Sequence, residues 1–360
     1  MSEKRNEKIV TCGYGLIGLC CSDCLLGPCR ISPFEKDGQR GICEDPADRM
    51  VVKNLFRKVT GEAWRGLADL KEALQELLSH HAHPGKRRQP FIEGQANIYE
   101  KYGCPSEKPK KIQSRYLSQE VVKLFSPFPQ GKTLLLKNLL PPKAFPLLTQ
   151  NSFSSGSLIS AFLDITSRGS TESPDMEILL EQCLQVSMIP LLCEELRQDI
   201  HHLISEEGMS RSDQIFYDVI KSLPEKPSPM IFLLSDEESS SGEWVHRMAR
   251  SLQRDLTGRV LTFSIHRIER LRELGERLSE RWSLPVAEMK IVTLISSPLA
   301  TRVLGALALG FSAISHPTLP IHGSDRVETF FSEILKKKFG NRYFFSWRED
   351  VANDVIDFLK

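Results

Sequence analysis

Six of the nine cysteines in this 360-residue chain lie within residues 12–43. Four of them follow the spacing C-x2-C-x4-C-x13-C: Cys21, Cys24, Cys29 and Cys43. A cubane iron–sulfur cluster takes four thiolates, so this set could hold one cluster within a single chain. The remaining two cysteines are two ligands short of a second cluster: Cys12 and Cys20. A second copy of the chain, related by a two-fold axis, would supply the missing two thiolates.

Zinc is the alternative occupant of the four-cysteine set, because four thiolates also form a closed tetrahedral zinc site. Structural zinc sites usually pair two C-x2-C knuckles. This chain has one knuckle, at Cys21 and Cys24, followed by a Gly-Pro-Cys step and a distant fourth ligand. The extra pair, Cys12 and Cys20, has no role in such a site. The spacing alone therefore favours an iron–sulfur cluster and leaves zinc open.

The composition is that of a soluble globular protein, with 41% hydrophobic and 26% charged residues. The 47 basic and 46 acidic residues nearly cancel, which gives no electrostatic reason to expect nucleic acid or an anionic membrane as a partner. The first residues are polar, and no stretch approaches about 18 uninterrupted apolar residues, so we expect a cytoplasmic protein. In that reducing compartment, clustered cysteines are more often metal ligands or redox groups than disulfides.

The segment Gly13-Tyr-Gly-Leu-Ile-Gly18 matches the dinucleotide-binding pattern G-x-G-x-x-G. That fingerprint opens a helix within a βαβ unit and meets an acidic ribose ligand about twenty residues later. Here a cysteine follows soon after Gly18, and turn formers and further cysteines come next. We therefore expect these glycines to let the backbone approach a cluster closely and donate N–H bonds to its sulfurs.

Helical patterns follow the cysteines. We predict helices over residues 46–57 and 62–80, short helices broken by prolines between 97 and 148, and helices over 157–165 and 176–204. The helix predicted over residues 62–80 has an apolar face: Leu67, Leu70, Ala73, Leu74, Leu77 and Leu78. Three isolated cysteines are expected to fill the core: Cys104, Cys183 and Cys193. Together these patterns indicate an all-helical domain that ends near residue 208.

From about residue 210, strands and helices alternate. Apolar runs of strand length lie at residues 230–234, 260–265, 289–295, 311–314 and 342–345, and helical stretches at 243–256, 268–282, 300–309, 324–339 and 349–359. Alternation without hairpin signals predicts a doubly wound parallel sheet of about five strands. The predicted fold class is multidomain α and α/β: an iron–sulfur segment at 1–57, a helical domain at 58–208, and a Rossmann-like α/β domain at 209–360.

The cysteine block, from Cys12 to Ile31 and again over residues 41–43 and 48–57, resembles the N-terminal segment of the anaerobic nickel-dependent carbon monoxide dehydrogenases. All six cysteine positions match. The resemblance implies that Cys12 and Cys20 hold a [4Fe-4S] cluster shared across a homodimer interface. It also implies that the other four hold a second [4Fe-4S] cluster within each subunit: Cys21, Cys24, Cys29 and Cys43. Residues 166–200 and parts of 306–345 resemble, more weakly, later helices and the last α/β domain of the family.

The chain departs from the family in the parts that carry catalysis. Family members are nearly twice as long, and their central α/β domain is missing here. Their nickel–iron–sulfur site takes one histidine and five cysteines, whereas this chain has three cysteines outside the block. No histidine lies between Arg57 and His80, where the family has proton-moving histidines, and Pro298 stands where a lysine is expected. The resemblance thus implies a truncated form, without nickel and without catalytic residues for carbon monoxide oxidation.

We therefore expect a homodimeric electron-transfer protein whose partner is a ferredoxin or another oxidoreductase. A mixed dimer with a full-length dehydrogenase is a second arrangement, because the shared cluster needs only two cysteines from each side. The alternatives are a non-redox interaction or scaffold protein with structural clusters, and an accessory subunit of a carbon monoxide dehydrogenase or other redox enzyme. A third alternative is an enzyme with a substrate site at the carboxyl ends of the strands: Ser296, His316 and His322.

Overall fold

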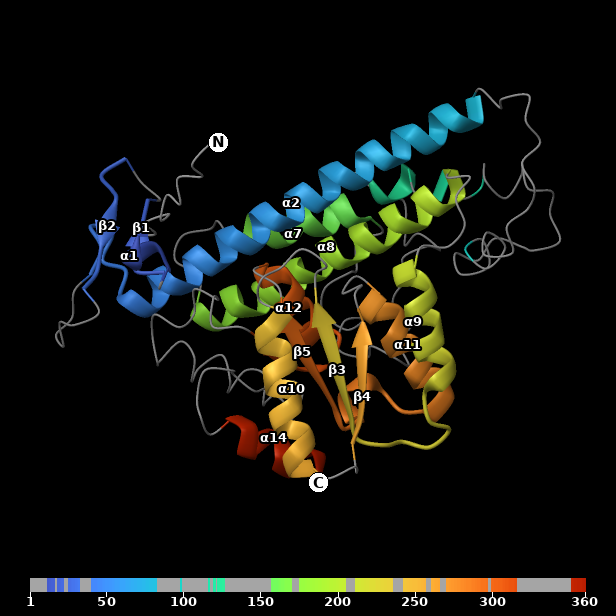
Figure 1. The fold of residues 1–360 in the computed structure, drawn as a ribbon. Coiled ribbons are helices and arrows are strands. Elements are labelled where there is room, and N and C mark those ends of the chain that lie inside the picture. Colours follow the sequence, from blue (N-terminus) through green and yellow to red (C-terminus); the bar gives the residue numbers. More distant parts are fainter. Residues whose placement is uncertain are drawn as a thin grey trace, which may run out of the picture.

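Long helices lie above the carboxyl ends of a parallel sheet in the computed structural model of the chain (Figure 1). The cysteine block lies at the N-terminal end of the longest helix. The structure describes residues 12–16, 18–22, 25–32, 40–82, 98, 116, 119–120, 122–126, 157–169, 175–204, 211–235, 242–256, 260–265, 270–296, 299–315 and 351–360.

The longest helix, α2, is continuous over Ala47–Ala82 and has 36 residues. The helical structure predicted over 46–57 and 62–80 is confirmed, but the predicted break between two separate helices is wrong. Val59 is fully buried and joins the buried positions Leu55 and Ala63, four residues away on either side, so the apolar face is unbroken. Gly61 lies on the exposed side of the helix and does not interrupt this face. Of the predicted apolar face further along, all positions are buried except Leu78.

α7, Leu158–Gly169, and α8, Met176–Ile204, lie where helices were predicted. The Ser157 hydroxyl accepts a hydrogen bond from the Ser160 N–H at 2.9 Å, which caps α7. α8 is long and apolar enough to cross a membrane, but 67% of its most apolar stretch is buried inside the protein. Packing against α2, α7 and α12 (Ala300–Ala308) therefore accounts for its composition.

Four parallel strands form a sheet in the order β4-β3-β5-β6. Their bounds are Met230–Ser235 for β3, Leu261–Ile265 for β4, Ile291–Ser296 for β5 and Ser312–Ser315 for β6. The parallel, doubly wound sheet is confirmed, as are four of its five predicted strands. The fifth strand, at 342–345, and the helix at 324–339 lie outside the described residues.

The helices around the sheet are α9 to α12 and α14. Four of these also confirm predictions: α10 (Gly242–Leu256), α11 (Leu271–Trp282), α12 and α14 (Val351–Leu359). A short 3-10 helix, η2 (Val286–Glu288), lies between α11 and β5. α9, Arg211–Ser222, was not predicted, because it begins with polar residues and then holds β-branched and aromatic residues of modest helix propensity. It forms because Phe216 and Val219, three residues apart, are buried on one face.

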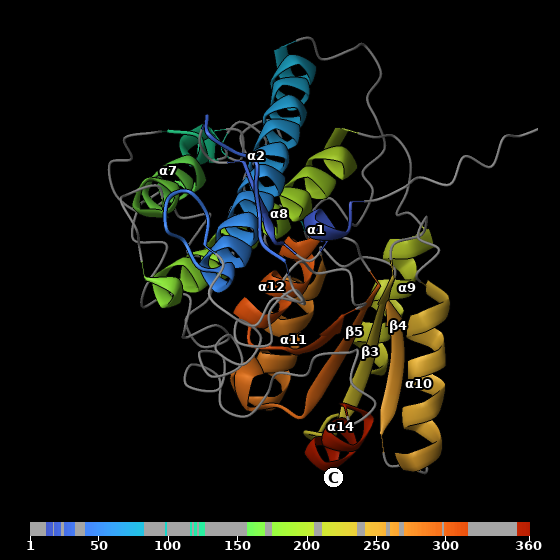
Figure 2. The ribbon, with the colours of Figure 1, turned by 90° about the vertical axis from the view of Figure 1, so that its left-hand side faces the viewer.

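The two faces of the sheet bury different sets of side chains, as the alternation along β3 shows. Ile231 and Leu233 pack with α10 and α14, whereas Phe232 and Leu234 belong to a larger core that includes α11 and α12 (Figure 2). That larger core continues through α8 and α2 to Leu19 and other residues of the cysteine block. The division into segments 1–57, 58–208 and 209–360 stays a prediction.

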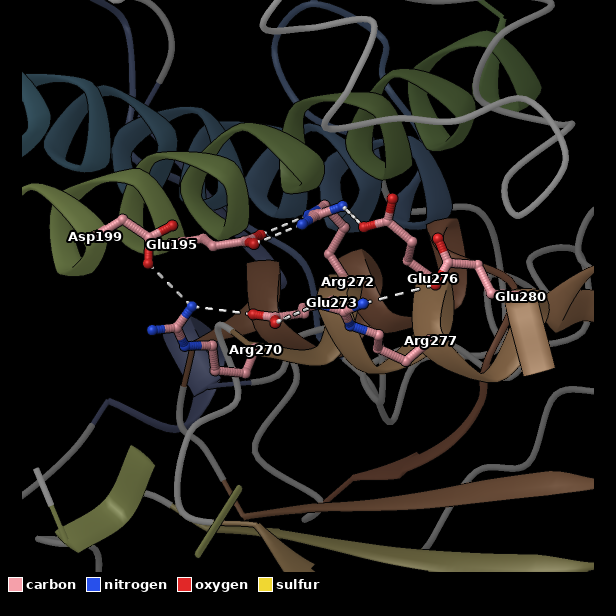
Figure 3. A network of polar contacts seen from close by, with 8 residues as sticks. All are labelled: Glu195, Asp199, Arg270, Arg272, Glu273, Glu276, Arg277 and Glu280. Carbon is pink, nitrogen blue, oxygen red and sulfur yellow. Dashed lines mark hydrogen bonds and ion pairs between the residues drawn. The ribbon is translucent and has the colours of Figure 1, made fainter. Parts of the chain in front are cut away.

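Buried ion pairs join α8 to α11 and the residue before it (Figure 3). Arg272 donates from Nε and Nη2 to the two carboxylate oxygens of Glu195, at 2.6 and 2.7 Å. Arg270 Nη1 lies 3.1 Å from both Asp199 Oδ1 and Glu273 Oε2. The helical part of the chain is thus bonded to the α/β part by charged groups that water does not reach.

Candidate metal centre

A two-stranded hairpin holds the central cysteines of the block. β1 (Cys20–Cys21) pairs with β2 (Cys29–Arg30) in antiparallel register, so that Cys21 stands directly opposite Cys29. The Cβ atoms of residues opposed in this way are about 4.5–5.5 Å apart. Leu19 and Ile31, just outside the two strands, are buried and anchor the hairpin in the core. The hairpin therefore brings together two cysteines that are eight positions apart in the sequence.

A turn before α2 brings a third cysteine to the hairpin. The turn is closed by a hydrogen bond from the Gly41 N–H to the Asp45 carbonyl at 2.9 Å, and it carries Cys43. The Ile42 N–H donates a hydrogen bond to Cys29 Sγ at 3.4 Å. Backbone N–H bonds to cysteine sulfur are among the groups that tune iron–sulfur clusters. The hydrogen bond also joins the turn to β2, so the segment that carries Cys43 lies next to Cys29.

The residues present fit a four-thiolate group as far as they are described. Cys21 is buried, Cys29 is half-buried and Cys43 is exposed, and all three are free thiols. Cys24, the predicted fourth ligand, lies outside the described residues. Within the part of the chain that the structure describes, no three His, Cys, Asp or Glu side chains gather to hold a single metal ion. The fit therefore rests on the hairpin, the turn and the thiol donor set.

The leftover pair, Cys12 and Cys20, lies on the segment leading into the hairpin. Cys12 is exposed just before the short helix α1, Gly13–Leu16, and Cys20 is half-buried in β1. The Asn54 amide on α2 donates from Nδ2 to the carbonyls of Gly18 and Cys20, at 2.8 and 2.9 Å. Gly18 has a φ of 76°, a left-handed conformation that favours glycine. These contacts fix the backbone on which the pair stands.

Asp45 is a buried carboxylate beside the third cysteine. The Cys43 thiol donates to Asp45 Oδ2 at 3.3 Å, Arg49 lies 3.4 Å from Oδ1, and Lys53 forms an ion pair with Oδ2. Burial raises the pKa of Asp45, but the hydrogen bonds from Lys53 and Cys43 outweigh it, so this pKa lies below its ordinary value. Asp45 therefore stays ionised and links the cysteine turn to α2.

The pKa of the Cys21 thiol is subject to opposing effects. Burial raises the pKa of its thiol above the ordinary value, while the hydrogen bond and charge of Arg57, and the charge of Lys53, work against that rise. The Cys43 thiol adds to the rise. Arg57 and Lys53 thus favour the negatively charged thiolate form of Cys21, which is the form that binds a metal.

Of the other six residues singled out in the sequence, the structure describes three. Cys183 and Cys193, both on α8, are completely buried, and burial raises the pKa of each thiol, so their prediction as core filler is confirmed. Ser296 is the last residue of β5 and pairs in register with Ser235 at the end of β3. Three lie outside the described residues: Cys104, His316 and His322.

The residues on and just before α2 that hold the cysteine block were not predicted. Asn54 and Arg57 of α2, and Asp45 in the turn before it, make these contacts, and the three stand at no recognisable metal-ligand spacing. One signal was available: basic residues recur every four positions at Arg49, Lys53 and Arg57, which places them on one face of a helix.

Comparison with known proteins adds a partial relationship. No protein-family model matches the chain. It is 31% identical over 108 residues to carbon monoxide dehydrogenase 1 of Methanosarcina acetivorans, which covers 29% of this chain and 17% of that protein. It is 30% identical over 144 residues to carbon monoxide dehydrogenase 2 of Carboxydothermus hydrogenoformans, which covers 38% and 22%. The chain spans less than a quarter of the length of the curated relatives it matches.

Solved structures give matches of larger extent at lower identity. A nickel-free carbon monoxide dehydrogenase from Thermococcus sp. AM4 aligns with a TM-score of 0.47 and 15% identity, over 93% of this chain and 57% of that one. Carbon monoxide dehydrogenase IV from Carboxydothermus hydrogenoformans aligns with a TM-score of 0.44 and 16% identity, over 91% and 56%. On the stretches of shared sequence alone, the chain is a relative of the carbon monoxide dehydrogenases over part of its length.

Proposed function

We propose that the chain is a carbon monoxide dehydrogenase-like [4Fe-4S] protein that transfers electrons and does not oxidise carbon monoxide on its own. The observation that carries this proposal is the junction of hairpin and turn, where Cys21 stands opposite Cys29 and the Ile42 N–H, next to Cys43 in the chain, bonds to Cys29 Sγ. The related proteins that share part of the sequence are carbon monoxide dehydrogenases by name. A [4Fe-4S] cluster supplies one-electron redox chemistry when bound.

The residues around the cysteines suit such a role. Leu19, Ile31 and α2 shield one side of the hairpin from water, while Leu25 and Leu26 at its tip are 104% and 71% exposed. Exposed apolar side chains next to a redox site are suited to contact another protein. A ferredoxin or another oxidoreductase is the partner we propose for that contact, in the cytoplasm.

The pair Cys12 and Cys20 supports a dimer. Both thiols are at least partly exposed, and once the other four cysteines of the block are assigned to one cluster, no cysteine of the block is left to complete a second. We assign them to a [4Fe-4S] cluster shared with a second copy of the chain or with a full-length dehydrogenase. In either assembly, each side contributes two cysteines.

The lack of carbon monoxide oxidation follows from residues in the sequence. Only three cysteines lie outside the block: Cys104, Cys183 and Cys193. The structure describes two of them, Cys183 and Cys193, which lie on α8 and are buried. Residues 58–79 hold no histidine, and Pro298 takes the place where the family resemblance calls for a lysine. A nickel–iron–sulfur site of the family's kind has no ligand set in these residues.

Anaerobically purified protein is expected to lose its visible absorbance with dithionite, to regain it on controlled oxidation, and to give no viologen reduction with carbon monoxide. Reversible bleaching separates electron transfer from a scaffold role, because a purely structural cluster need not change oxidation state over the accessible range. Iron-loaded protein that dithionite does not bleach would favour the scaffold alternative. Carbon monoxide-dependent viologen reduction with stoichiometric nickel would overturn the proposal.

A further inference from the structure

Three cations of α2 form one row facing the cysteine block. Arg49, Lys53 and Arg57 are four residues apart, so they follow one another along a single face of the first three turns of α2. All three are half-buried, and α2 contacts β1 over this stretch. The row is therefore part of the wall of the candidate site.

Each cation of the row is held in place by an ion pair or a hydrogen bond. Lys53 and Arg49 are ion-paired to the buried carboxylate of Asp45, which accepts the hydrogen bond of the Cys43 thiol. Arg57 Nη1 donates to Asn54 Oδ1 at 3.3 Å, and Asn54 in turn holds the backbone of β1. The same guanidinium acts on the Cys21 thiol and opposes the rise that burial causes in its pKa.

The row places positive charge beside a buried thiol. Lys53 reaches the cysteines through Asp45, which accepts the hydrogen bond of the Cys43 thiol. The charges of Arg57 and Lys53 act on Cys21, which is 7% exposed, so water screens them weakly. Fixed cations therefore act on the most buried predicted ligand.

We propose that this row, and Arg57 above all, sets the reduction potential of the cluster held by the four-cysteine set. The inference rests on the proposed function. Reduction adds negative charge to a group that its thiolates already make negative, so a fixed cation stabilises the reduced state more than the oxidised state and raises the potential. A carboxylate at the same distance acts in the opposite direction, so Asp45 lowers it.

The test is an EPR-monitored redox titration of the anaerobic protein and four variants. Arg57→Gln is expected to shift the reduction equilibrium about tenfold toward the oxidised state, about 59 mV for a one-electron couple. Arg57→Lys keeps the charge and should stay closer to the unmodified protein. Asp45→Asn is expected to move the potential the other way. The control is Arg65→Gln, an exposed cation of the same helix that lies outside the row, about 12 Å along α2 from Arg57, and it should leave the potential unchanged.

The outcomes separate this inference from the proposed function. Unmodified protein without any reducible iron signal would reject both. Iron-loaded Arg57→Gln protein with an unshifted potential would reject the inference alone. If Arg57→Gln fails to hold iron, Lys53→Gln gives the second measurement, and an unshifted potential there rejects the inference equally. Loss of iron from both variants would assign the row to holding the cysteine segment, which also overturns a role in tuning the potential.

Discussion

Arg272→Met is expected to lower the free energy of unfolding by about 3–5 kcal/mol, because it leaves the Glu195 carboxylate buried without its main partner. Arg272 is 1% exposed and Glu195 is 0% exposed, and two hydrogen bonds join them (Figure 3). The Glu276 carboxylate, 2.7 Å from Arg272 Nη1, loses a partner as well. Urea unfolding followed by tryptophan fluorescence measures the change, since Trp282 lies at the end of α11.

Two further variants show whether the lost stability comes from the unpaired charge. The double variant Arg272→Met with Glu195→Leu removes both partners and should recover at least half of the loss, because two apolar groups of similar size need no hydrogen bonds there. Arg277→Met is the matched control on the same helix: its ion pairs are 3.7 and 3.9 Å long and its side chain is half exposed. It should change stability by about 0.5 kcal/mol or less. Equal losses from Arg272→Met and Arg277→Met would contradict the account of this network.

Cys21→Ala is expected to remove the cluster within each subunit and leave the shared one, so that iron falls from about six to about two atoms per chain. Cys21 is the buried ligand of the set, it stands opposite Cys29, and it receives the Arg57 hydrogen bond. Iron and protein determination on anaerobically purified samples measures the loss.

The matched control for this variant is Cys183→Ala. Cys183 is an equally buried cysteine on α8, outside the cysteine block, and its removal should leave iron at about six atoms per chain. An unchanged iron content in Cys21→Ala would refute the ligand assignment. A loss of iron in Cys183→Ala would show that iron retention reports on folding rather than on ligation.

The elements that the sequence predicted well are those with a strong local pattern. The run Met230–Leu234 is apolar throughout, as a strand buried on both faces must be, and the parallel sheet follows from its alternation with helices. The apolar residues that recur along α8 predicted its extent closely. The cysteine spacing predicted a four-thiolate set; the structure pairs Cys21 with Cys29 across the hairpin and bonds the turn that carries Cys43 to Cys29, and the ligand assignment itself stays a prediction.

The features that the sequence did not predict depend on contacts between distant segments. Arg272 and Glu195 are 77 residues apart, and charged residues are ordinarily expected on the surface, so nothing local marks them as buried partners. Asn54 is 34 residues from the Cys20 carbonyl it binds. The continuity of α2 at Val59 was missed because Thr60 and Gly61 have modest helix propensity, which tertiary packing overrides.

The central claim is that residues 12–43 of two chains hold [4Fe-4S] clusters. Metal analysis with EPR on anaerobically purified protein tests it most directly. We predict brown protein with about six irons per chain, no nickel, and an EPR signal that dithionite produces and oxidation removes. Colourless protein with stoichiometric zinc and no iron would contradict the claim.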